Sequence, residues 1–350
     1  MGRVTGRGVA QNLRQHYPRW VLRLAVMLLL IANIANLGAM GAALDLLLPG
    51  HAALYTAAFA TLCVALEAFM NYASYAAVLK WLTASLLTYV AVVFAVHVPW
   101  GEALLGTLIP TISFDNDHAV AFVAVLGTTI SPYLFFWQAS QEVEEEQRLM
   151  QDPLTLRPDE APPELQRIDL DTWVGMGYSN LIAIFIIFAT AATLHARGIT
   201  SINTAAEAAE ALRPIAGEFT FVIFACGIIG TGLLAVPVLA GSGAYAVCEA
   251  FGWTEGLDHK PRQARAFYGT IAVSTMIGLM LNFVGINPIK ALYWSAVLNG
   301  LLAAPLMVAM LLIACNSAIM GPLTLPRSMR LIGWLAALVM AAASLAFFVL

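Results

Sequence analysis

The residues best placed to do chemistry interrupt an apolar segment that is long enough to cross a bilayer. Residues 117–142 are mostly apolar, and Gly127-Thr128-Thr129-Ile130-Ser131-Pro132 stands near their middle. Proline removes a backbone donor and clashes with the preceding turn, and the Thr-Thr-Ile run is poor helix material, so several carbonyls lose their helical partners. Hydrocarbon tolerates such groups only where protein encloses them or where they line a cavity. Broken helices form the ion and substrate sites of many secondary transporters, although a proline kink that only shapes packing is the simpler alternative.

The composition excludes a soluble globular protein. Hydrophobic residues make up 60% of the 350 and charged residues 11%, and the mean hydropathy is +0.80. A helix needs about 20 apolar residues to cross roughly 30 Å of hydrocarbon. Segments of this length predict an all-α polytopic membrane protein with nine spans. The predicted spans are 19–48, 52–70, 75–97, 117–142, 172–196, 214–249, 265–286, 288–315 and 329–350.

Basic residues predict the orientation of the chain. If residues 1–18 form a cytoplasmic segment, all but three of the 17 Lys and Arg residues fall inside, and Arg197, Arg213 and Lys290 fall outside. Cytoplasmic segments are enriched in Lys and Arg. We therefore expect an integral, multi-pass protein of a bacterial inner (plasma) membrane, with its N-terminus in the cytoplasm and its C-terminus outside. The lipid bilayer is an expected partner, nucleic acid is not, and the sequence leaves the oligomeric state open.

Polar stretches mark the connections. Residues 143–171 are rich in Glu, Asp and Pro and predict a cytoplasmic loop between the fourth and fifth spans. Thr204 followed by Ala and Glu residues predicts a short capped helix on the outer surface. The cysteines lack the spacing of a zinc site or a disulfide framework, and we expect all four in the core. They are Cys63, Cys226, Cys248 and Cys315.

The segment around the break resembles the sixth transmembrane segment of the Nramp family of divalent metal transporters. That resemblance rests on GTTISPYLFFWQAS and extends to NLGAMGAALDLLL for the third span, GIIGTGLLAVPVLAGSGAY for the eighth, FVGINPIKALYWSAVLNG between the ninth and tenth, and ACNSAIMGPL after the tenth. It implies a LeuT-like inverted-repeat fold in one transmembrane domain, 1–350, whose nine spans correspond to family spans 3 to 11. Residues 19–98 would be the remainder of the first repeat, 117–315 the second repeat, and 329–350 the final span.

Three departures from the family pattern shape the expectation. Nothing in the chain matches the family's first two spans, including a broken helix that supplies an ion-binding carboxylate, so we expect an N-terminally truncated protein. Ser131 stands in the position of a metal-binding methionine and Tyr133 in that of a histidine. Asn33 and Asn36 stand where many members place acids associated with proton movement, and amides do not ionise at ordinary pH. The last two departures resemble the magnesium-transporting, atypical branch.

The break supplies the first candidate metal ligands. Ser131 would offer its hydroxyl, and Thr128 and Ile130 their freed carbonyls, although a membrane serine often bonds back to its own helix. Thr129 would orient the site or cap the helix, and Tyr133 would support the site or only pack.

Further polar residues lie in other spans. Asn180 and Asn299 are uncharged groups at depth, where ligand contacts or interhelical hydrogen bonds are both expected. Gln138 is expected to pack. Glu67 and Asp45 are expected at the membrane interface. The glutamates that follow the broken helix predict a solvated face or, alternatively, a vestibule that attracts cations. They are Glu142, Glu144, Glu145 and Glu146.

These observations predict a secondary transporter of divalent metal cations, with Mg²⁺ or Mn²⁺ favoured over Fe²⁺ because the donors are oxygens. The metal ion would be the transported ligand, and no cofactor is expected. One alternative is a truncated scaffold or fragment that does not transport, and a less favoured one is an organic-substrate transporter of the same fold. No enzyme is expected, because the sequence contains neither HExxH nor GxSxG.

Overall fold

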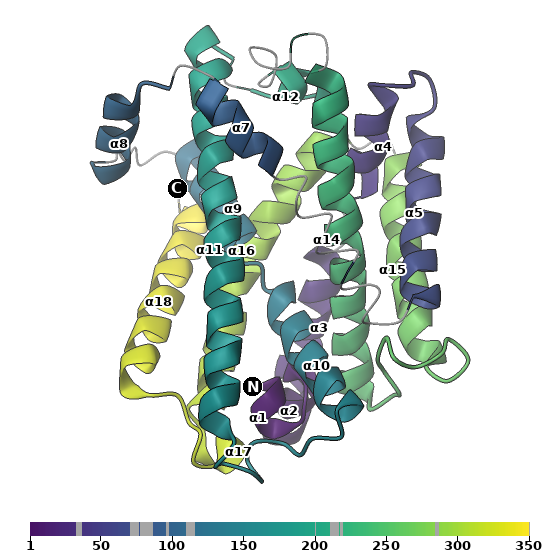
Figure 1. Cartoon of the computed structure of the whole chain (residues 1–350), viewed down its shortest axis with the longest axis vertical. Coiled ribbons are helices and arrows are strands. Elements are labelled where there is room, and N and C mark those ends of the chain that lie inside the picture. Colours follow the sequence, from purple (N-terminus) through teal and green to yellow (C-terminus); the bar gives the residue numbers. More distant parts are fainter. Residues whose placement is uncertain are drawn as a thin grey trace.

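The computed structural model of the chain describes residues 1–32, 37–70, 87–95, 98–109, 116–199, 201–210, 220–283 and 287–349, together with residues 77 and 217. Every regular element within these ranges is a helix, and the long helices run roughly along one axis of the bundle (Figure 1). The elements up to Arg148 are, in chain order, α1 (Gly2–Thr5), α2 (Val9–His16), α3 (Arg19–Ala32), α4 (Leu37–Asp45), α5 (Ala52–Phe69), α7 (Leu87–Ala95), α8 (Trp100–Leu108), α9 (Asn116–Thr129) and α10 (Tyr133–Arg148). The later elements are α11 (Ala161–Thr193), the 3₁₀ helix η2 (His195–Arg197), α12 (Ala205–Ala209), α14 (Thr220–Phe251), α15 (Arg265–Phe283), α16 (Pro288–Ala314), α17 (Ser317–Met320) and α18 (Arg327–Val349).

The helices confirm an all-α polytopic membrane protein. Six segments of the described chain are long and apolar enough to cross a membrane. They are Ala52–Phe69, His118–Arg148, Ala161–Arg197, Phe221–Phe251, Pro288–Ala314 and Arg327–Val349. The predicted span 265–286 is the helix α15, which is not among these six. The predicted span 19–48 holds α3 and α4.

Part of the prediction lies outside the described residues. This holds for Asn33 and Asn36 and for most of the predicted span 75–97, of which α7 is the main described part.

The predicted loop 143–171 is too long. The helix α10 continues to Arg148 and α11 begins at Ala161, so the connection covers only residues 149–160. Prolines occupy the first turn of α11, where a missing backbone N–H costs nothing. The connection is held by backbone hydrogen bonds from Leu154 N to Arg3 O at 3.1 Å and from Thr155 N to Val4 O at 3.0 Å.

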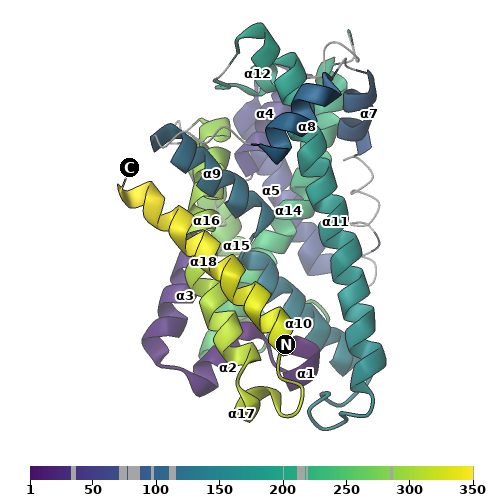
Figure 2. The ribbon, with the colours of Figure 1, turned by 90° about the vertical axis from the view of Figure 1, so that its left-hand side faces the viewer.

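The N-terminal segment is folded into the bundle. The short helices α1 and α2 lie at the same end of the molecule as α17 and the end of α10 (Figures 1 and 2). Val9 and Leu13 of α2 are buried in one core cluster with Phe136 of α10 and Ile313 of α16. Because these apolar side chains need a common core, the segment fixes the position of α10.

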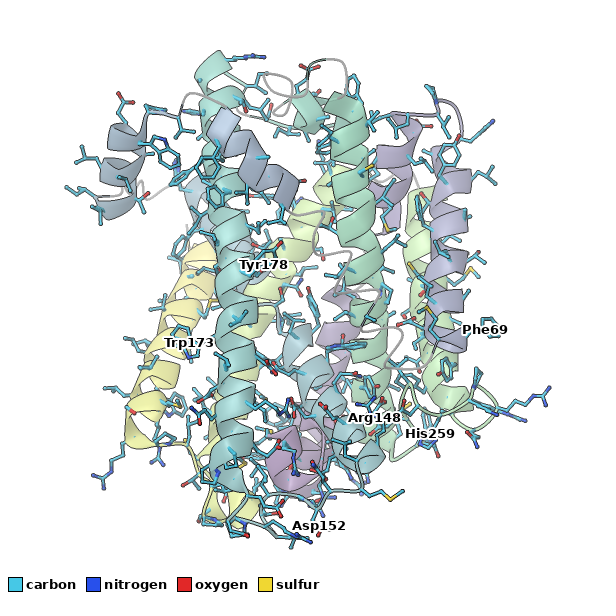
Figure 3. All side chains as sticks on the ribbon, in the orientation of Figure 1. Phe69, Arg148, Asp152, Trp173, Tyr178 and His259 are labelled. Carbon is cyan, nitrogen blue, oxygen red and sulfur yellow. The ribbon has the colours of Figure 1, made fainter. Side chains whose placement is uncertain are left out.

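The outer surface of the bundle is apolar. Phe69 and Trp173, both labelled in Figure 3, are 87% and 78% exposed. Arg148, Asp152 and His259 all lie in the lower part of that view. An apolar belt with charges gathered at one end is what a bilayer-embedded bundle requires.

Two smaller predictions have mixed outcomes. The Thr204 hydroxyl accepts a hydrogen bond from Glu207 N at 3.1 Å and caps α12, which confirms the predicted capped helix. All four cysteines are free; Cys63 and Cys248 are buried, but Cys226 is exposed and Cys315 is partly exposed. The prediction of four core cysteines is therefore wrong for the last two, because helix α14 turns Cys226 away from the core and Cys315 follows the end of α16.

Candidate metal site

The predicted interruption is a break between two helices. The helix α9 ends at Thr129 and α10 begins at Tyr133. Proline has no N–H, so the Thr128 carbonyl loses the donor that position 132 would supply in a continuous helix. The Ser131 hydroxyl takes over this role and donates to Thr128 O at 3.1 Å. Ser131 is only 7% exposed, and the helix restarts with a hydrogen bond from Leu134 N to Ser131 O at 3.0 Å.

The threonine hydroxyls at the break also bond to their own helix. Thr128 Oγ1 donates to Val125 O at 2.8 Å, and Thr129 Oγ1 lies 3.1 Å from Val125 O and 3.0 Å from Leu126 O. Both hydroxyl protons are therefore used within α9 itself. A hydroxyl that donates keeps its lone pairs, so the oxygens of Ser131 and Thr129 remain possible cation ligands.

The break lies beside a close helix crossing. A Cβ on Gly127 would lie 2.0 Å from Ala296 O and 2.4 Å from Gly300 N, and a Cβ on Gly300 would lie 2.3 Å from Val123 O. Glycine is required on both helices because only backbone fits between α9 and α16 there. The crossing places Asn299, the neighbour of Gly300 in α16, next to this region. Asn299 is 8% exposed, and its Oδ1 has no hydrogen-bond partner among the described residues.

A cavity of about 450 Å³ extends from the break along α10. Thr129, Ile130 and Ser131 line one end of it, and the carboxylates of Glu142 and Glu145 line the other. Thr172 and Met176 form the facing wall on α11, and Trp137, Gln138 and Gln141 are further α10 residues of the lining.

This arrangement favours the vestibule interpretation for Glu142 and Glu145. Two carboxylates at the mouth of a cavity raise the local concentration of cations. Arg167 moderates this charge, because its guanidinium lies 3.1 Å from Glu142. No cluster of three or more His, Cys, Asp or Glu side chains that could hold a metal occurs in the part of the chain that the structure describes.

Comparison with known proteins decides the family. The family profile of Nramp, described as natural resistance-associated macrophage protein-like, matches residues 1–350. The chain belongs to the Nramp family. Two proteins of Klebsiella pneumoniae named divalent metal cation transporter MntH are 25% and 26% identical to it over 351 residues, which cover 95% of this chain and 77% of theirs. An MntH of Acidiphilium cryptum is 24% identical over 92% of this chain and 72% of its own.

A solved structure supports the same fold. The crystal structure of a single-residue mutant of the Eremococcus coleocola manganese transporter aligns with a TM-score of 0.73 at 15% identity. The alignment covers 98% of this Nramp chain and 74% of that protein. At this identity the likeness concerns the fold alone.

Asn180 is not brought to the break. It is exposed, and its Nδ2 donates to Met176 O at 2.8 Å within α11. Residues 172, 176 and 180 share one helical face, because residues four apart lie above one another. Asn180 therefore continues the cavity-lining face of α11 by one turn. That i, i+4 spacing is the signal that would have identified Thr172 and Met176, which the sequence analysis missed. Tyr133 is half-buried at the first residue of α10.

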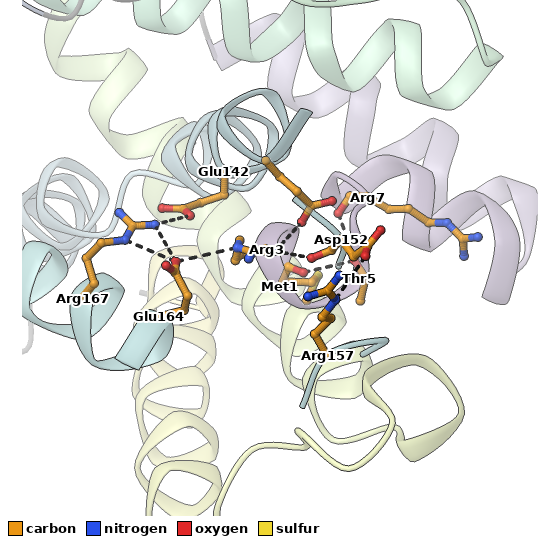
Figure 4. A network of polar contacts seen from close by, with 10 residues as sticks. Met1, Arg3, Thr5, Arg7, Glu142, Asp152, Arg157, Glu164 and Arg167 are labelled. Carbon is orange, nitrogen blue, oxygen red and sulfur yellow. Dashed lines mark hydrogen bonds and ion pairs between the residues drawn. The ribbon is translucent and has the colours of Figure 1, made fainter. Parts of the chain in front are cut away.

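Two of the four glutamates do not form a solvated face. Glu144 and Glu146 are 7% and 5% exposed. Glu144 Oε1 accepts hydrogen bonds from the Tyr245 hydroxyl and from Leu257 N, the latter at 2.7 Å. Glu146 forms an ion pair with Arg3 at 3.0 Å, and Arg3 lies within a larger network of polar contacts (Figure 4). The expectation fails because the N-terminal segment and residues 252–264 pack against α10 and cover these side chains.

Removing Arg3 should strongly destabilise this Nramp chain. Arg3 and Glu146 are 3% and 6% exposed, and Arg3 also donates to Asp152 O at 2.6 Å. Taking away one partner of a buried ion pair leaves the other charge uncompensated, which costs about 3–5 kcal/mol. Thermal unfolding of Arg3→Ala in detergent should show this loss. Arg157→Ala, which removes two exposed ion pairs, to Asp152 and to Glu160, is the control and should unfold close to the wild type. Equal unfolding temperatures for the two variants would contradict the prediction.

The prediction that Glu67 lies at the membrane interface is also wrong. It is 1% exposed rather than interfacial, and neither carboxyl oxygen has a hydrogen-bond partner among the described residues. A Cβ on Gly241 of α14 would lie 3.5 Å from Glu67 Oε1 and 2.4 Å from the Trp137 ring, so both side chains pack against α14 at this glycine. The sequence placed Glu67 near a span end correctly, but only tertiary packing shows that α14 covers it.

Glu255 should make stability depend on pH. Burial, together with the charges of Glu249 and Glu144, raises the pKa of Glu255 to about 9, and Arg14 opposes this shift. The unfolded chain releases this proton near the ordinary pKa of 4.5 while the folded chain keeps it, so this group lowers stability as pH rises from about 4.5 to 9. Glu255→Gln removes the effect. The difference in melting temperature between Glu255→Gln and the wild type should therefore increase, in favour of the variant, by at least ~2 to 4 °C from about pH 5 to pH 8. A shift of this size corresponds to about 1 kcal/mol.

The control for this experiment is Glu102→Gln, which changes an exposed glutamate on α8. It should keep the wild-type pH profile. A Glu255→Gln profile parallel to that of the wild type would refute the assignment.

Proposed function

We propose that this Nramp chain is a secondary transporter of divalent metal cations and that the ion binds at the helix break between Thr128 and Tyr133. The observation that carries the proposal is the cavity that joins the break to Glu142 and Glu145. It combines oxygen donors at one end with a carboxylate mouth at the other. The relatives in Klebsiella pneumoniae and Acidiphilium cryptum that carry the name divalent metal cation transporter support the same cargo.

The ligands we assign are all oxygens. The Ser131 hydroxyl and the carbonyls of Thr128 and Ile130 contact the ion directly, and the unpartnered Oδ1 of Asn299 is the candidate from α16. Thr129 and Tyr133 orient the break, and Asn180 lies on the approach along α11. Oxygen donors suit Mg²⁺ and Mn²⁺, whereas a thioether suits softer ions. We therefore infer a preference for Mg²⁺ or Mn²⁺ over Fe²⁺.

Transport of this kind requires a binding site and a route for the ion. It requires neither a resident cofactor nor a chemical conversion of the cargo. The chain is an integral, multi-pass membrane protein. We propose a bacterial inner membrane with the N-terminal segment in the cytoplasm, which places Glu142 and Glu145 at the cytoplasmic mouth.

Metal uptake into liposomes tests the proposal. The chain is reconstituted, and Mn²⁺ entry is followed with a fluorescent indicator trapped inside, with protein-free liposomes as the background. Uptake above background that millimolar Mg²⁺ inhibits is the expected result. Glu142→Gln/Glu145→Gln should raise the Mn²⁺ concentration for half-maximal uptake while leaving the maximal rate close to normal, because the mouth concentrates ions without binding them in transit.

Two results would count against the proposal. Uptake that prefers Fe²⁺ and ignores Mg²⁺ would overturn the metal assignment. Background-level uptake of every divalent ion by folded, monodisperse protein would favour the scaffold that does not transport.

A further inference from the structure

A second cavity lies far from the break along the chain, between α3 and α14, with α2 at one end. Its volume is about 700 Å³. Three arginines line it: Arg14 of α2, and Arg19 and Arg23 of α3. Within the described residues, no hydrogen bond or ion pair occupies these three guanidinium groups. We call this cavity the arginine groove.

The walls of the arginine groove change from charged to apolar along α3. Arg19 and Arg23 occupy its first two turns with Leu22 between them, and Val26 and Met27 follow on the same face. The spacing i, i+3, i+4, i+7 and i+8 aligns these residues on one stripe. The stripe therefore places positive charge where α3 begins and hydrocarbon deeper along the helix.

The facing wall belongs to the end of α14. Val247, Ala250 and Phe251 line it, again at i, i+3 and i+4. Phe251 is 64% exposed and stacks on Trp253, with ring centroids 4.8 Å apart. Met27 on the α3 side is 53% exposed, and α3 lies at the outside of the bundle (Figure 2). The groove is thus open at the surface and not filled by its own side chains.

The positive charge at the groove is poorly compensated. The charge of Arg14 acts on Glu255, but burial and the charges of Glu249 and Glu144 outweigh it and raise the pKa of Glu255 to about 9, so this carboxyl keeps its proton at neutral pH. Trp20, between Arg19 and Val21, is 67% exposed, as expected of a residue that anchors a helix at the membrane–water boundary. The arginines therefore lie at the level of lipid headgroups and the apolar stripe at the level of acyl chains.

We propose that the arginine groove binds one anionic phospholipid from the leaflet on the side of the N-terminal segment. The guanidinium groups match phosphate oxygens through paired, charge-assisted hydrogen bonds. The apolar walls of α3 and α14 then hold an acyl chain. A small soluble anion would contact the arginines but not the apolar side chains of Met27 and Phe251, so a lipid fits the groove better. An anionic lipid fits better than a zwitterionic one, because each basic residue near an anionic leaflet adds attraction that zwitterionic lipid does not provide.

Native mass spectrometry of the full chain tests the proposal. The protein is taken from nanodiscs of equimolar phosphatidylglycerol and phosphatidylcholine, and the lipid retained is identified. The wild type should retain one phosphatidylglycerol in preference. Arg19→Gln/Arg23→Gln should lower that preference on the order of ten- to thirtyfold. The matched control is Arg327→Gln/Arg330→Gln, which removes two exposed arginines from the first turn of α18 and should leave the preference unchanged.

Two further arms separate a lipid from a free anion. Ala250→Phe fills the apolar wall and should reduce retention although all three arginines remain. Inorganic phosphate at millimolar concentration should not displace the lipid. Retention that ignores Ala250→Phe and yields to phosphate would overturn the lipid assignment.

The wild type alone supplies a check that needs no variant. A phosphatidylglycerol with a photoreactive acyl chain should crosslink to peptides that contain Met27 or Phe251. Crosslinks spread evenly over the exposed surfaces of α11 and α18, or equal retention by the two double variants, would overturn the proposal.

Discussion

Ser131→Met should convert the metal preference of the chain from hard to soft cations. In liposomes, Mn²⁺ uptake by this variant should lose its inhibition by Mg²⁺, and uptake of Cd²⁺, a soft ion, should rise relative to Mg²⁺ on the order of tenfold, about 1.4 kcal/mol. The reason is the donor atom. A hydroxyl oxygen suits Mg²⁺, and a thioether sulfur is polarizable and binds soft ions more tightly. Ser131 lines the cavity of about 450 Å³, which leaves space for the longer side chain.

Ser131→Ala separates the loss of oxygen from the gain of sulfur. Both variants lose the hydroxyl that donates to Thr128 O at 3.1 Å, so both change the local backbone support equally. The alanine variant should transport Mg²⁺ and Mn²⁺ more weakly without gaining Cd²⁺. If both variants show the same metal profile, residue 131 does not contact the ion.

The break itself could be predicted from the sequence because its cause is local. Pro132 lacks an N–H and the preceding Thr-Thr-Ile run is poor helix material, whatever surrounds them. The observed gap between Thr129 and Tyr133 agrees with this expectation. The helices α16 and α18 and the end of α14 could also be predicted to within a few residues, since their length and hydropathy are properties of single segments.

The burial of charged residues could not be predicted in this way. Glu144 and Glu146 lie in an acidic run typical of a solvated helix end, and their partners are remote in sequence. Arg3 lies 143 residues from Glu146, and Tyr245 lies 101 residues from Glu144. Neither pairing leaves a periodic pattern in its own segment. The same holds for Glu67, whose burial depends on Gly241 and Trp137 from two other helices.

Prediction of the cavity would require both the local sequence pattern and the packing of the helices. Its floor at Ser131 follows from the local break, whereas its facing wall depends on which helix packs beside α10. The sequence pointed to Asn180 on α11 because of its polarity, but the cavity is lined one and two turns earlier, by Met176 and Thr172. The sequence therefore identified the correct helix but a position one or two turns away from the cavity. This error is expected when a site is inferred before the packing of its helices is known.

Gly127→Leu should abolish transport and destabilise the bundle, because the crossing at the break has no room for a side chain. A Cβ at this position would lie 2.0 Å from Ala296 O and 2.4 Å from Gly300 N, and these backbone atoms cannot rotate away as a side chain would. Overpacking of this kind costs about 1–3 kcal/mol and is relieved by moving the helices apart. Separation of α9 from α16 would also displace Asn299 from the break. The expected result is background Mn²⁺ uptake and a melting temperature lower by about 2 to 4 °C for each kcal/mol lost.

The matched control is Gly177→Leu, in a membrane helix at a position where an added Cβ meets nothing within 4 Å. It should keep wild-type uptake and stability. Gly127→Ala should fall between the two, since its single methyl group creates the clash without the bulk of leucine. If Gly127→Leu transports normally, the close crossing of α9 and α16 does not position the ion site, and the role assigned to Asn299 fails with it.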